Sequence, residues 1–228
     1  MALRTAGIIV AAALGLLIGC AEGRPAITRG AEDSVPTPPA AGAAAEPTIV
    51  FLGTSLTAGY GLDPDSAFTV LVQHKIDSAG LQFRVVNAGV SGESSAGALR
   101  RIDWILRQPP SFLIIETGAN DGLRGQSPDS IQANIQTMID RVRAMSPSTR
   151  IVLAGMEALP NLGADYVRRF RAIFPALAKA NKLPLIPFLL VGVAGVDSLN
   201  QQDGIHPNPA GSRIVATTVW RGLEPLLR

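Results

Sequence analysis

The sequence predicts an α/β domain in which a parallel sheet is covered by helices on both faces. Short apolar runs of strand length alternate along the chain with longer segments of helical periodicity, which is the pattern of repeated strand–helix–strand units. The loops that follow the apolar runs are rich in glycine, hydroxyl and amide side chains. These loops are expected to carry the function, because ligands bind at the carboxyl ends of parallel strands.

Five segments are predicted to be strands. Four are apolar runs of the kind found in buried strands, namely residues 48–52, 83–87, 112–116 and 150–154. The fifth, residues 183–187, is shorter and contains two prolines. Because proline has no N–H to donate to a neighbouring strand, this segment is expected at an edge of the sheet.

Helical periodicity fills the segments between the predicted strands and the C-terminal segment. Ser127 and Pro128 open one of these helices, since proline is favoured at the first helical position. Right-handed connections between the strands are the expected default. The helices are predicted over residues 66–79, 98–106, 131–142, 166–182 and 209–227.

The N-terminal residues 1–19 are predicted to be a lipoprotein signal peptide. Arg4 precedes an apolar run over residues 7–18, which has the length of a signal-peptide core and is short for a membrane span. Leu-Ile-Gly-Cys at residues 17–20 resembles the bacterial lipobox, in which the cysteine becomes lipidated. Cys20 is the only cysteine of the chain and stands where cleavage is expected. The alternative is an ordinary secretory signal with an incidental cysteine.

Residues 20–47 are predicted to be a disordered linker, because they are rich in alanine, proline and glycine and lack hydrophobic periodicity. Acyl chains on Cys20 would anchor the protein to a membrane surface. The predicted location is a membrane facing the periplasm or the cell exterior. Ala21, in place of an aspartate after the cysteine, favours the outer membrane where the cell has one. Residues 48–228 are then one domain, without cysteine and long enough for a sizeable core.

Charge and composition argue against two classes of function. The net charge is +2, and the cluster of Arg168, Arg169 and Arg171 is not interleaved with aromatic residues, so we expect a solvated helix face and no nucleic-acid partner. Two separated histidines and no cysteine in the domain argue against a zinc site.

His206 is the candidate general base. The chain has two histidines, and His74 falls among polar residues of a predicted helix, where it is expected to be solvated. Of all side chains, histidine has the ordinary pKa closest to neutral pH, which suits a general base. Asp203, three residues before His206, is the candidate for orienting its ring. The alternative is a turn aspartate that accepts hydrogen bonds from local backbone N–H groups.

Ser55 is the candidate nucleophile. It lies just past the first predicted strand, among small residues that leave room for a substrate. A serine hydroxyl needs a base to remove its proton; His206 can supply that base, and Asp203 can fix the tautomer of the ring. The alternative is that residues 53–55 cap a helix, a common use of serine and threonine.

Three groups are candidates for binding the oxyanion that acyl transfer generates. They are the backbone N–H groups of Ser55 and Gly92 and the side-chain amide of Asn120. Gly92 lacks a side chain, so its N–H can approach a substrate closely. The alternatives for Gly92 and Asn120 are ordinary turn residues.

Four sequence blocks in register resemble the SGNH (GDSL) hydrolases, most closely their bacterial thioesterase, arylesterase and lysophospholipase branch. The similarity extends over the whole domain and is closest at residues 120–125 and 203–208. The blocks are Gly-Thr-Ser-Leu at 53–56, Ser-Gly-Glu at 91–93, Gly-Ala-Asn-Asp at 118–121 and Asp-Gly-Ile-His-Pro at 203–207.

The resemblance implies a three-layer α/β/α sandwich with a flavodoxin-like, five-stranded parallel sheet. It also implies a serine esterase in which Ser55 is the nucleophile, His206 the base and Asp203 its partner. Ser55, Gly92 and Asn120 would form the oxyanion hole. Members of this family use no metal or organic cofactor, so none is expected here.

Three residues depart from the family pattern. Thr54 stands where the family usually has an aspartate, so the hydrogen bonds of this turn are expected to differ. Ala119 replaces a common glycine, and its methyl group is expected to narrow the cleft. Glu93 replaces an aspartate just beyond Gly92.

The expected substrates are aryl esters, short- to medium-chain acyl esters, thioesters and lysophospholipids. Leu123, Leu159 and Pro160 come from apolar loops and are candidates for the wall of an acyl groove; the alternative is ordinary loop packing. A rival of the same fold is a carbohydrate acetylesterase. Rivals of other classes are a catalytically inactive binding lipoprotein and a flavodoxin-like phosphate- or flavin-binding lipoprotein using residues 53–59. The flavin alternative leaves Asn120, Asp203 and His206 unexplained. No oligomeric state is predicted.

Overall fold

The computed structural model describes residues 46–228, so the predicted signal peptide, Cys20 and nearly all of the predicted linker lie outside it. The described residues contain a five-stranded parallel sheet with the order β2-β1-β3-β4-β5. The strands are β1 (Thr48–Gly53), β2 (Arg84–Gly89), β3 (Phe112–Glu116), β4 (Arg150–Ala154) and β5 (Leu185–Ile186).

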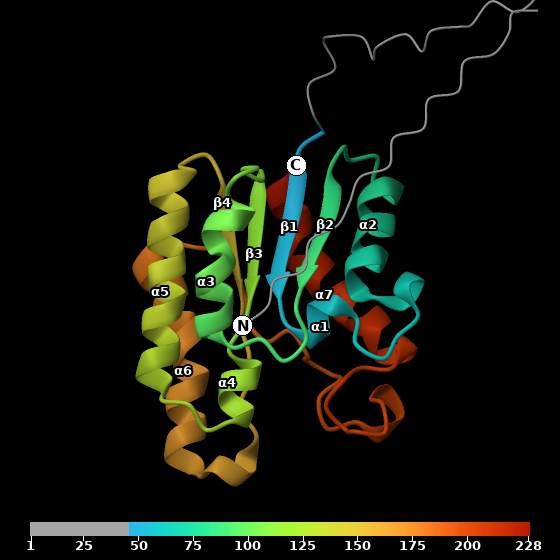
Figure 1. Cartoon of the computed structure of the whole chain (residues 1–228). Coiled ribbons are helices and arrows are strands. Elements are labelled where there is room, and N and C mark those ends of the chain that lie inside the picture. Colours follow the sequence, from blue (N-terminus) through green and yellow to red (C-terminus); the bar gives the residue numbers. More distant parts are fainter. Residues whose placement is uncertain (1–45) are drawn as a thin grey trace, which may run out of the picture. The chain divides into compact units, whose positions relative to one another are not determined.

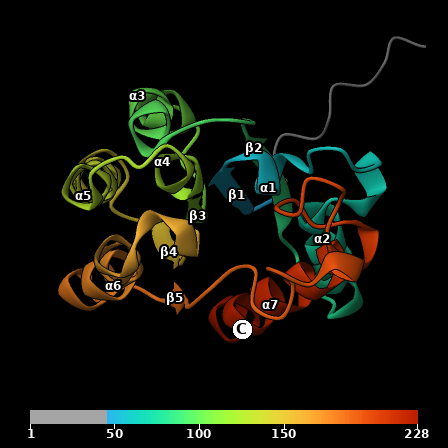
Figure 2. The ribbon, with the colours of Figure 1, turned by 90° about the horizontal axis from the view of Figure 1, so that it is seen from below.

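Helices cover both faces of the sheet and form a three-layer α/β/α sandwich, which confirms the predicted fold class. Figure 2, a view along the strands, shows α2 and α7 on one face and α3, α5 and α6 on the other. The helices are α1 (Ser55–Ala58), α2 (Phe68–Ser78), α3 (Ser95–Ile105), α4 (Ala119–Leu123), α5 (Pro128–Met145), α6 (Ala164–Asn181) and α7 (Pro209–Leu227), with 3-10 turns at Pro64–Ser66, Pro160–Leu162 and Asp197–Leu199.

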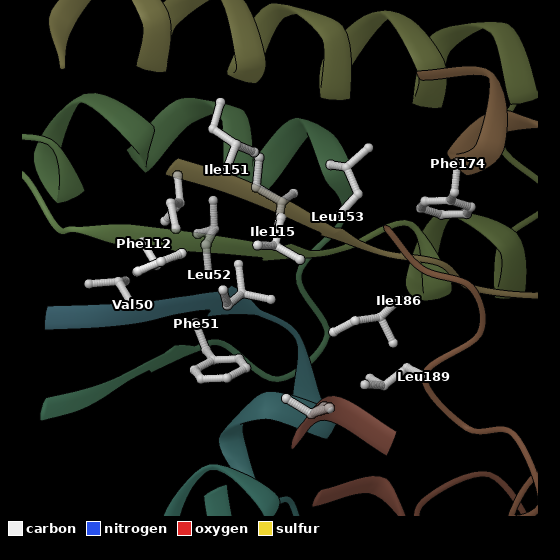
Figure 3. Close-up of a cluster of buried hydrophobic side chains, with 14 of the residues drawn as sticks. Val50, Phe51, Leu52, Phe112, Ile115, Ile151, Leu153, Phe174, Ile186 and Leu189 are labelled. Atoms are coloured by element: carbon white, nitrogen blue, oxygen red, sulfur yellow. The ribbon is translucent and has the colours of Figure 1, made fainter. Parts of the chain in front are cut away.

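The core lies between these layers. All five residues of β3 are buried, as are Ile49 to Gly53 of β1. Figure 3 shows their side chains in one cluster with those of β4 and β5 and with Phe174 of α6. Full burial of each large aliphatic side chain contributes about 1.5–3 kcal/mol, so the sheet is a well-packed base for the loops at its edge.

The predicted bounds match the structure closely for the central elements. The segments predicted over residues 112–116, 150–154 and 209–227 are β3, β4 and α7. The prediction that the fifth strand lies at an edge is confirmed by β5.

The prediction of a buried second strand is wrong. β2 lies at the other edge of the sheet, and its residues are half-buried or exposed. The physical reason is topological: β3 pairs with the opposite side of β1, which leaves β2 with one neighbouring strand. A short apolar run cannot by itself distinguish these two positions.

Two short helices, α1 and α4, occupy segments that the sequence analysis treats as loops. Leu123 is therefore the last residue of a helix and not a loop residue. Helices α1 and α4 are each a single turn or little more, which is too short for a hydrophobic period to be visible in the sequence.

The carboxyl ends of all five strands lie on the same side of the sheet, where α1 and α4 also lie (Figure 1). β1 begins on the opposite side, where the amino ends of the strands lie, and α7 runs back and ends there as well (Figure 1). Among residues 46–228, no helix combines the length and the apolar character that crossing a membrane requires.

Candidate active site

The turn after β1 presents Ser55. Thr54 is the N-cap of α1, and its Oγ1 accepts a 3.5 Å hydrogen bond from the N–H of Leu56. The capping role expected as an alternative for this turn therefore falls to Thr54, and Ser55 follows as the first helical residue. A Cβ at Gly53 would lie 2.0 Å from Thr57 Oγ1, so this tight turn requires glycine.

A buried carboxyl group, Glu116, lies against this turn from the carboxyl end of β3. Its Oε2 accepts hydrogen bonds from the Thr54 N–H at 2.7 Å and from Thr57 Oγ1 at 2.9 Å, and its Oε1 accepts from Thr54 Oγ1 at 2.9 Å. Burial raises the pKa of Glu116 to about 7, against the opposing effect of these hydrogen bonds. Thr54, which departs from the family's aspartate, thus supplies Glu116 with two donors.

Glu116 was not among the site residues expected from the sequence. The available signal is a charged residue that ends an otherwise apolar strand, Phe-Leu-Ile-Ile-Glu. A carboxyl group in that position is either at the surface or buried and held by hydrogen-bond donors. Glu116 is 1% exposed, so it belongs to the second kind.

Ser55, His206 and Asp203 lie in one hydrogen-bonded chain. His206 Nε2 is 2.8 Å from Ser55 Oγ, and His206 Nδ1 is 2.7 Å from Asp203 Oδ2. Asp203 and His206 come from the loop that precedes α7. Asn208 caps α7 by accepting from the N–H groups of Ala210 and Gly211, at 2.9 Å and 3.1 Å, and so fixes the end of that loop.

Asp203 makes the contacts that both interpretations of it require. Its Oδ2 contacts the ring of His206, while its Oδ1 accepts from the backbone N–H groups of Ile205 and His206, each at 3.0 Å. Desolvation raises the pKa of Asp203, but the hydrogen bonds from His206 and Ile205 outweigh it and lower the pKa to about 2. An ionised Asp203 holds a proton on Nδ1 of His206, which leaves Nε2 as an acceptor for the Ser55 hydroxyl.

Tyr60 covers the ring of His206, a contact that the sequence analysis does not predict. The ring centroids are 4.8 Å apart and the planes are tilted by 42°. Tyr60 is 53% exposed and lines the cavity together with His206.

Gly92 and Asn120 line the same cavity as Ser55 and His206. Gly92 has a φ of 78°, in the left-handed region that favours glycine. Asn120 Nδ2 donates a 3.1 Å hydrogen bond to the carbonyl oxygen of Glu93. A primary amide has two N–H donors, so one remains for a group in the cavity.

The cavity has a volume of about 590 Å³ and mainly apolar walls. Leu123, Leu159 and Pro160, the three residues suggested for an acyl groove, all line it, and so does Ala119. Phe188 and Leu190, which follow β5, also line the cavity and were not indicated by the sequence, because their segment carries no pattern that shows which side chains turn inward. The further apolar residues of the wall are Leu56, Met156, Ala158, Phe188, Leu190 and Ile205.

The remaining charged and histidine candidates lie elsewhere. His74 is exposed on α2, as expected. The arginine cluster of α6 is also exposed, and Arg168, Arg169 and Arg171 pair with Asp165, Asp129 and Glu157 respectively. Within the described part of the chain, no three histidine, cysteine or acidic side chains gather into a possible metal site.

Proteins similar to this chain are ester hydrolases. The chain is 39% identical to the esterase TesA of Pseudomonas aeruginosa, over 81% of this chain and 91% of TesA. It is 35% identical to the thioesterase 1/protease 1/lysophospholipase L1 of Escherichia coli, over 81% of this chain and 87% of that protein.

The fold is also shared with solved structures. The crystal structure of the psychrotrophic esterase EstA from a Pseudoalteromonas species, inhibited by monoethylphosphonate, aligns with a TM-score of 0.75 at 32% identity, covering 80% of this chain and 99% of EstA. Residues 51–214 match the model of the GDSL-like lipase/acylhydrolase family. This match and the two relatives confirm the family that the four sequence blocks indicated. The chain therefore belongs to the GDSL-like lipase/acylhydrolase family and is an ester hydrolase.

Proposed function

We propose that the domain is a serine esterase that hydrolyses carboxylic esters through an acyl-Ser55 intermediate. The observation that carries the proposal is the chain of short contacts from Ser55 Oγ through His206 to Asp203, of 2.8 Å and 2.7 Å. Nucleophile, base and orienting carboxylate are the three roles that acyl transfer to serine requires.

In the acylation step, Ser55 Oγ attacks the ester carbonyl carbon while His206 Nε2 takes the hydroxyl proton. The carbonyl oxygen becomes an oxyanion, bound by the N–H groups of Ser55 and Gly92 and by the Asn120 amide. The C–O bond to the alcohol, or the C–S bond to a thiol, then breaks, and His206 returns the proton to the leaving group. Asp203 stabilises the imidazolium that forms in between.

In the deacylation step, water replaces the alcohol. His206 takes a proton from the water as it attacks the acyl-Ser55 carbonyl, and the same three donors bind the second oxyanion. Cleavage of the bond to Ser55 Oγ releases the carboxylic acid, and the proton returns to Ser55. Each donor is worth roughly 3 kcal/mol in such transition states.

The apolar cavity supports aryl esters and short- to medium-chain acyl esters as substrates, with thioesters and lysophospholipids as further candidates. Its wall of Leu123, Leu159 and Pro160, with Phe188 and Leu190, would contact an acyl chain. An acetyl group has no chain to fill such a space, which disfavours the carbohydrate acetylesterase alternative.

The lipoprotein character of the N-terminal segment is part of the same proposal. Lipidation of Cys20 would retain the esterase on a membrane facing the periplasm or the exterior, where exogenous esters and lysophospholipids are accessible. Mass spectrometry of the mature N-terminus tests this: a diacylglyceryl-modified Cys20 is expected, and an unmodified terminus at another residue would refute it.

A panel of p-nitrophenyl esters from acetate to laurate, run on wild type, Ser55→Ala and Ser78→Ala, tests the activity. Ser78 is an exposed serine of α2 and serves as the control. We expect a maximum at butyrate or longer chains, loss of activity in Ser55→Ala and wild-type rates in Ser78→Ala. A fluorophosphonate probe should label Ser55 alone. Full activity in Ser55→Ala, or labelling at another residue, would overturn the proposal.

A further inference from the structure

We propose that Arg101 and Glu93 form a positioning pair. The pair holds the oxyanion donors Gly92 and Asn120 in a fixed position relative to the nucleophile Ser55. The segment concerned, residues 90–94, is called the oxyanion loop below. The inference rests on the proposed roles of Ser55, Gly92 and Asn120, and it assigns a function to two residues that lie outside the cavity.

The guanidinium group of Arg101 is bound on two sides. Its Nε donates to Glu93 Oε1 at 2.7 Å, and its Nη2 donates to Glu93 Oε2 at 2.6 Å, so the carboxylate is held by two parallel bonds. Nη2 also donates to the backbone carbonyl of Ala88 at 2.7 Å and, more weakly, to that of Gly53 at 3.3 Å. The side chains of Arg101 and Glu93 are only 21% and 10% exposed.

These bonds join three segments that the proposed chemistry uses. Gly53 ends β1 and leads into the turn that presents Ser55. Ala88, near the end of β2, leads into the oxyanion loop. Glu93 lies within that loop and directly follows Gly92. Because the guanidinium group is planar and rigid, its bonds to all three segments fix their relative positions to within the tolerance of a hydrogen bond.

Glu93 is connected to two of the proposed oxyanion donors, Gly92 of the oxyanion loop and Asn120 of α4. Its backbone follows the peptide of Gly92, and its carbonyl oxygen accepts from Asn120 Nδ2 at 3.1 Å. A displacement of Glu93 would therefore move the Gly92 N–H and turn the Asn120 amide together. The carboxylate of Glu93 is the part of this residue that Arg101 holds.

The packing around Glu93 is fitted to its side chain. Gly97 of α3 lies alongside, and a Cβ at Gly97 would be 2.7 Å from Glu93 Cγ. A glycine at this position leaves space for the extra methylene by which Glu93 exceeds the family's usual aspartate. The longer side chain of Glu93 still reaches Arg101, which lies about one helical turn after Gly97 on α3.

Because neither residue touches the cavity, the pair is expected to affect the transition state and not substrate binding. The test compares Glu93→Gln, Arg101→Gln and the double variant with wild type. Arg100→Gln is the control, since Arg100 is the neighbouring arginine of α3 and is exposed. The measurements are kcat and KM for p-nitrophenyl butyrate, inhibition by a trifluoromethyl ketone and by butyrate, and the thermal unfolding midpoint.

We expect kcat to fall about 10- to 100-fold in Glu93→Gln and Arg101→Gln, with KM changed less than about 2-fold. Inhibition by the trifluoromethyl ketone, which forms an oxyanion on Ser55, should weaken in parallel with kcat, whereas inhibition by butyrate should not change. The double variant should lose no more than the larger single loss, because both changes remove one interaction. Arg100→Gln should match wild type.

An unchanged kcat in folded Glu93→Gln would overturn the inference, and so would a loss that appears equally in KM and in butyrate inhibition. Glu93→Gln leaves the bonds from Arg101 to Ala88 and Gly53 in place, so it decides the matter if Arg101→Gln does not fold. Failure of the proposed function is a separate result, since it would appear as activity in Ser55→Ala.

Discussion

The Oγ of Ser55 lies 2.8 Å from Nε2 of His206, although the two residues are 151 positions apart in the chain. Ser55 follows the first strand, and His206 precedes the last helix. The parallel sheet brings the two together, because the carboxyl ends of its strands and the loop before α7 meet at one edge.

Replacing Asp203 by asparagine tests the orientation of His206. An asparagine amide would donate to Nδ1 where the carboxylate accepts from it, which favours the tautomer with a proton on Nε2. That tautomer cannot take the Ser55 proton, so kcat should fall about 10³- to 10⁴-fold. Steady-state kinetics with p-nitrophenyl butyrate measures this; a loss below 10-fold would mean that Asp203 does not control the tautomer.

We also expect Asp203→Asn to change how the free energy of unfolding depends on pH. The pKa of Asp203 is lowered in the folded protein to about 2, so the stabilisation is present above its ordinary value of 3.8 and is lost as pH falls toward 2. Wild type should therefore be more stable than Asp203→Asn at pH 5 to 7, and the difference should shrink in acid. Urea unfolding at several pH values checks this, and a difference that grows in acid would contradict it.

The effect of Glu116 on the pH dependence of stability is expected to have the opposite sign to that of Asp203. Burial raises its pKa from 4.5 to about 7, so between these values the folded protein binds more protons than the unfolded chain, and stability falls as pH rises. The fall attributable to Glu116 is on the order of 3 kcal/mol across this interval. In Glu116→Gln the slope should largely disappear.

Urea unfolding of wild type and Glu116→Gln at pH values from 4 to 8 measures the slope. Glu224→Gln is the matched control, because Glu224 pairs with Arg228 at the surface. A slope that persists unchanged in Glu116→Gln, or that is lost equally in the control, would show that other groups cause it.

Tyr60 is expected to support His206 through its ring and not its hydroxyl group. Aromatic pairs at such distances contribute about 0.5–1.5 kcal/mol, so Tyr60→Ala should lower kcat/KM about 2- to 10-fold. Tyr60→Phe retains the ring at 4.8 Å and should stay close to wild type. Equal losses in the two variants would instead assign the effect to the hydroxyl.

Ala158, in the apolar wall of the cavity, is suited to testing the position of the acyl chain. A phenyl ring in Ala158→Phe would fill space that a longer chain needs. Hydrolysis of p-nitrophenyl octanoate should fall at least about 10-fold relative to p-nitrophenyl acetate, which serves as the internal control. If both rates change by the same factor, the acyl chain lies elsewhere.

The fold was predictable because its central elements carry strong local patterns. β3 and β4 are apolar runs between polar segments, and α7 has a helical period opened by proline. The edge position of β2 was not predictable, because it depends on which side of β1 the later strand β3 joins. Strand order is a property of the whole chain and leaves little trace in a six-residue run.

The candidate site residues could be grouped from the sequence for a different reason: their types and order match a family pattern. Ser55 and Asp203 each have common alternative uses in such loops, so their order along the chain, together with the other matching blocks, identifies them. The contacts of Glu116 and Arg101 were not predictable, because a buried carboxyl group or a half-buried guanidinium group is recognised only by its partners. The partners of Glu116 are a backbone N–H and hydroxyls about 60 residues earlier in the chain, and those of Arg101 include backbone carbonyls as well as the Glu93 carboxylate, a combination that no local pattern identifies.

The direction of β1 and α7 has a practical consequence. Both ends of the described chain lie where the strands begin (Figure 1), whereas the cavity is lined by residues that follow the carboxyl ends of the strands. A fusion partner, an affinity tag or a solid support attached at either end would therefore leave the mouth of the cavity open to solution. Immobilised enzyme should keep its access to bulky esters whichever end carries the attachment.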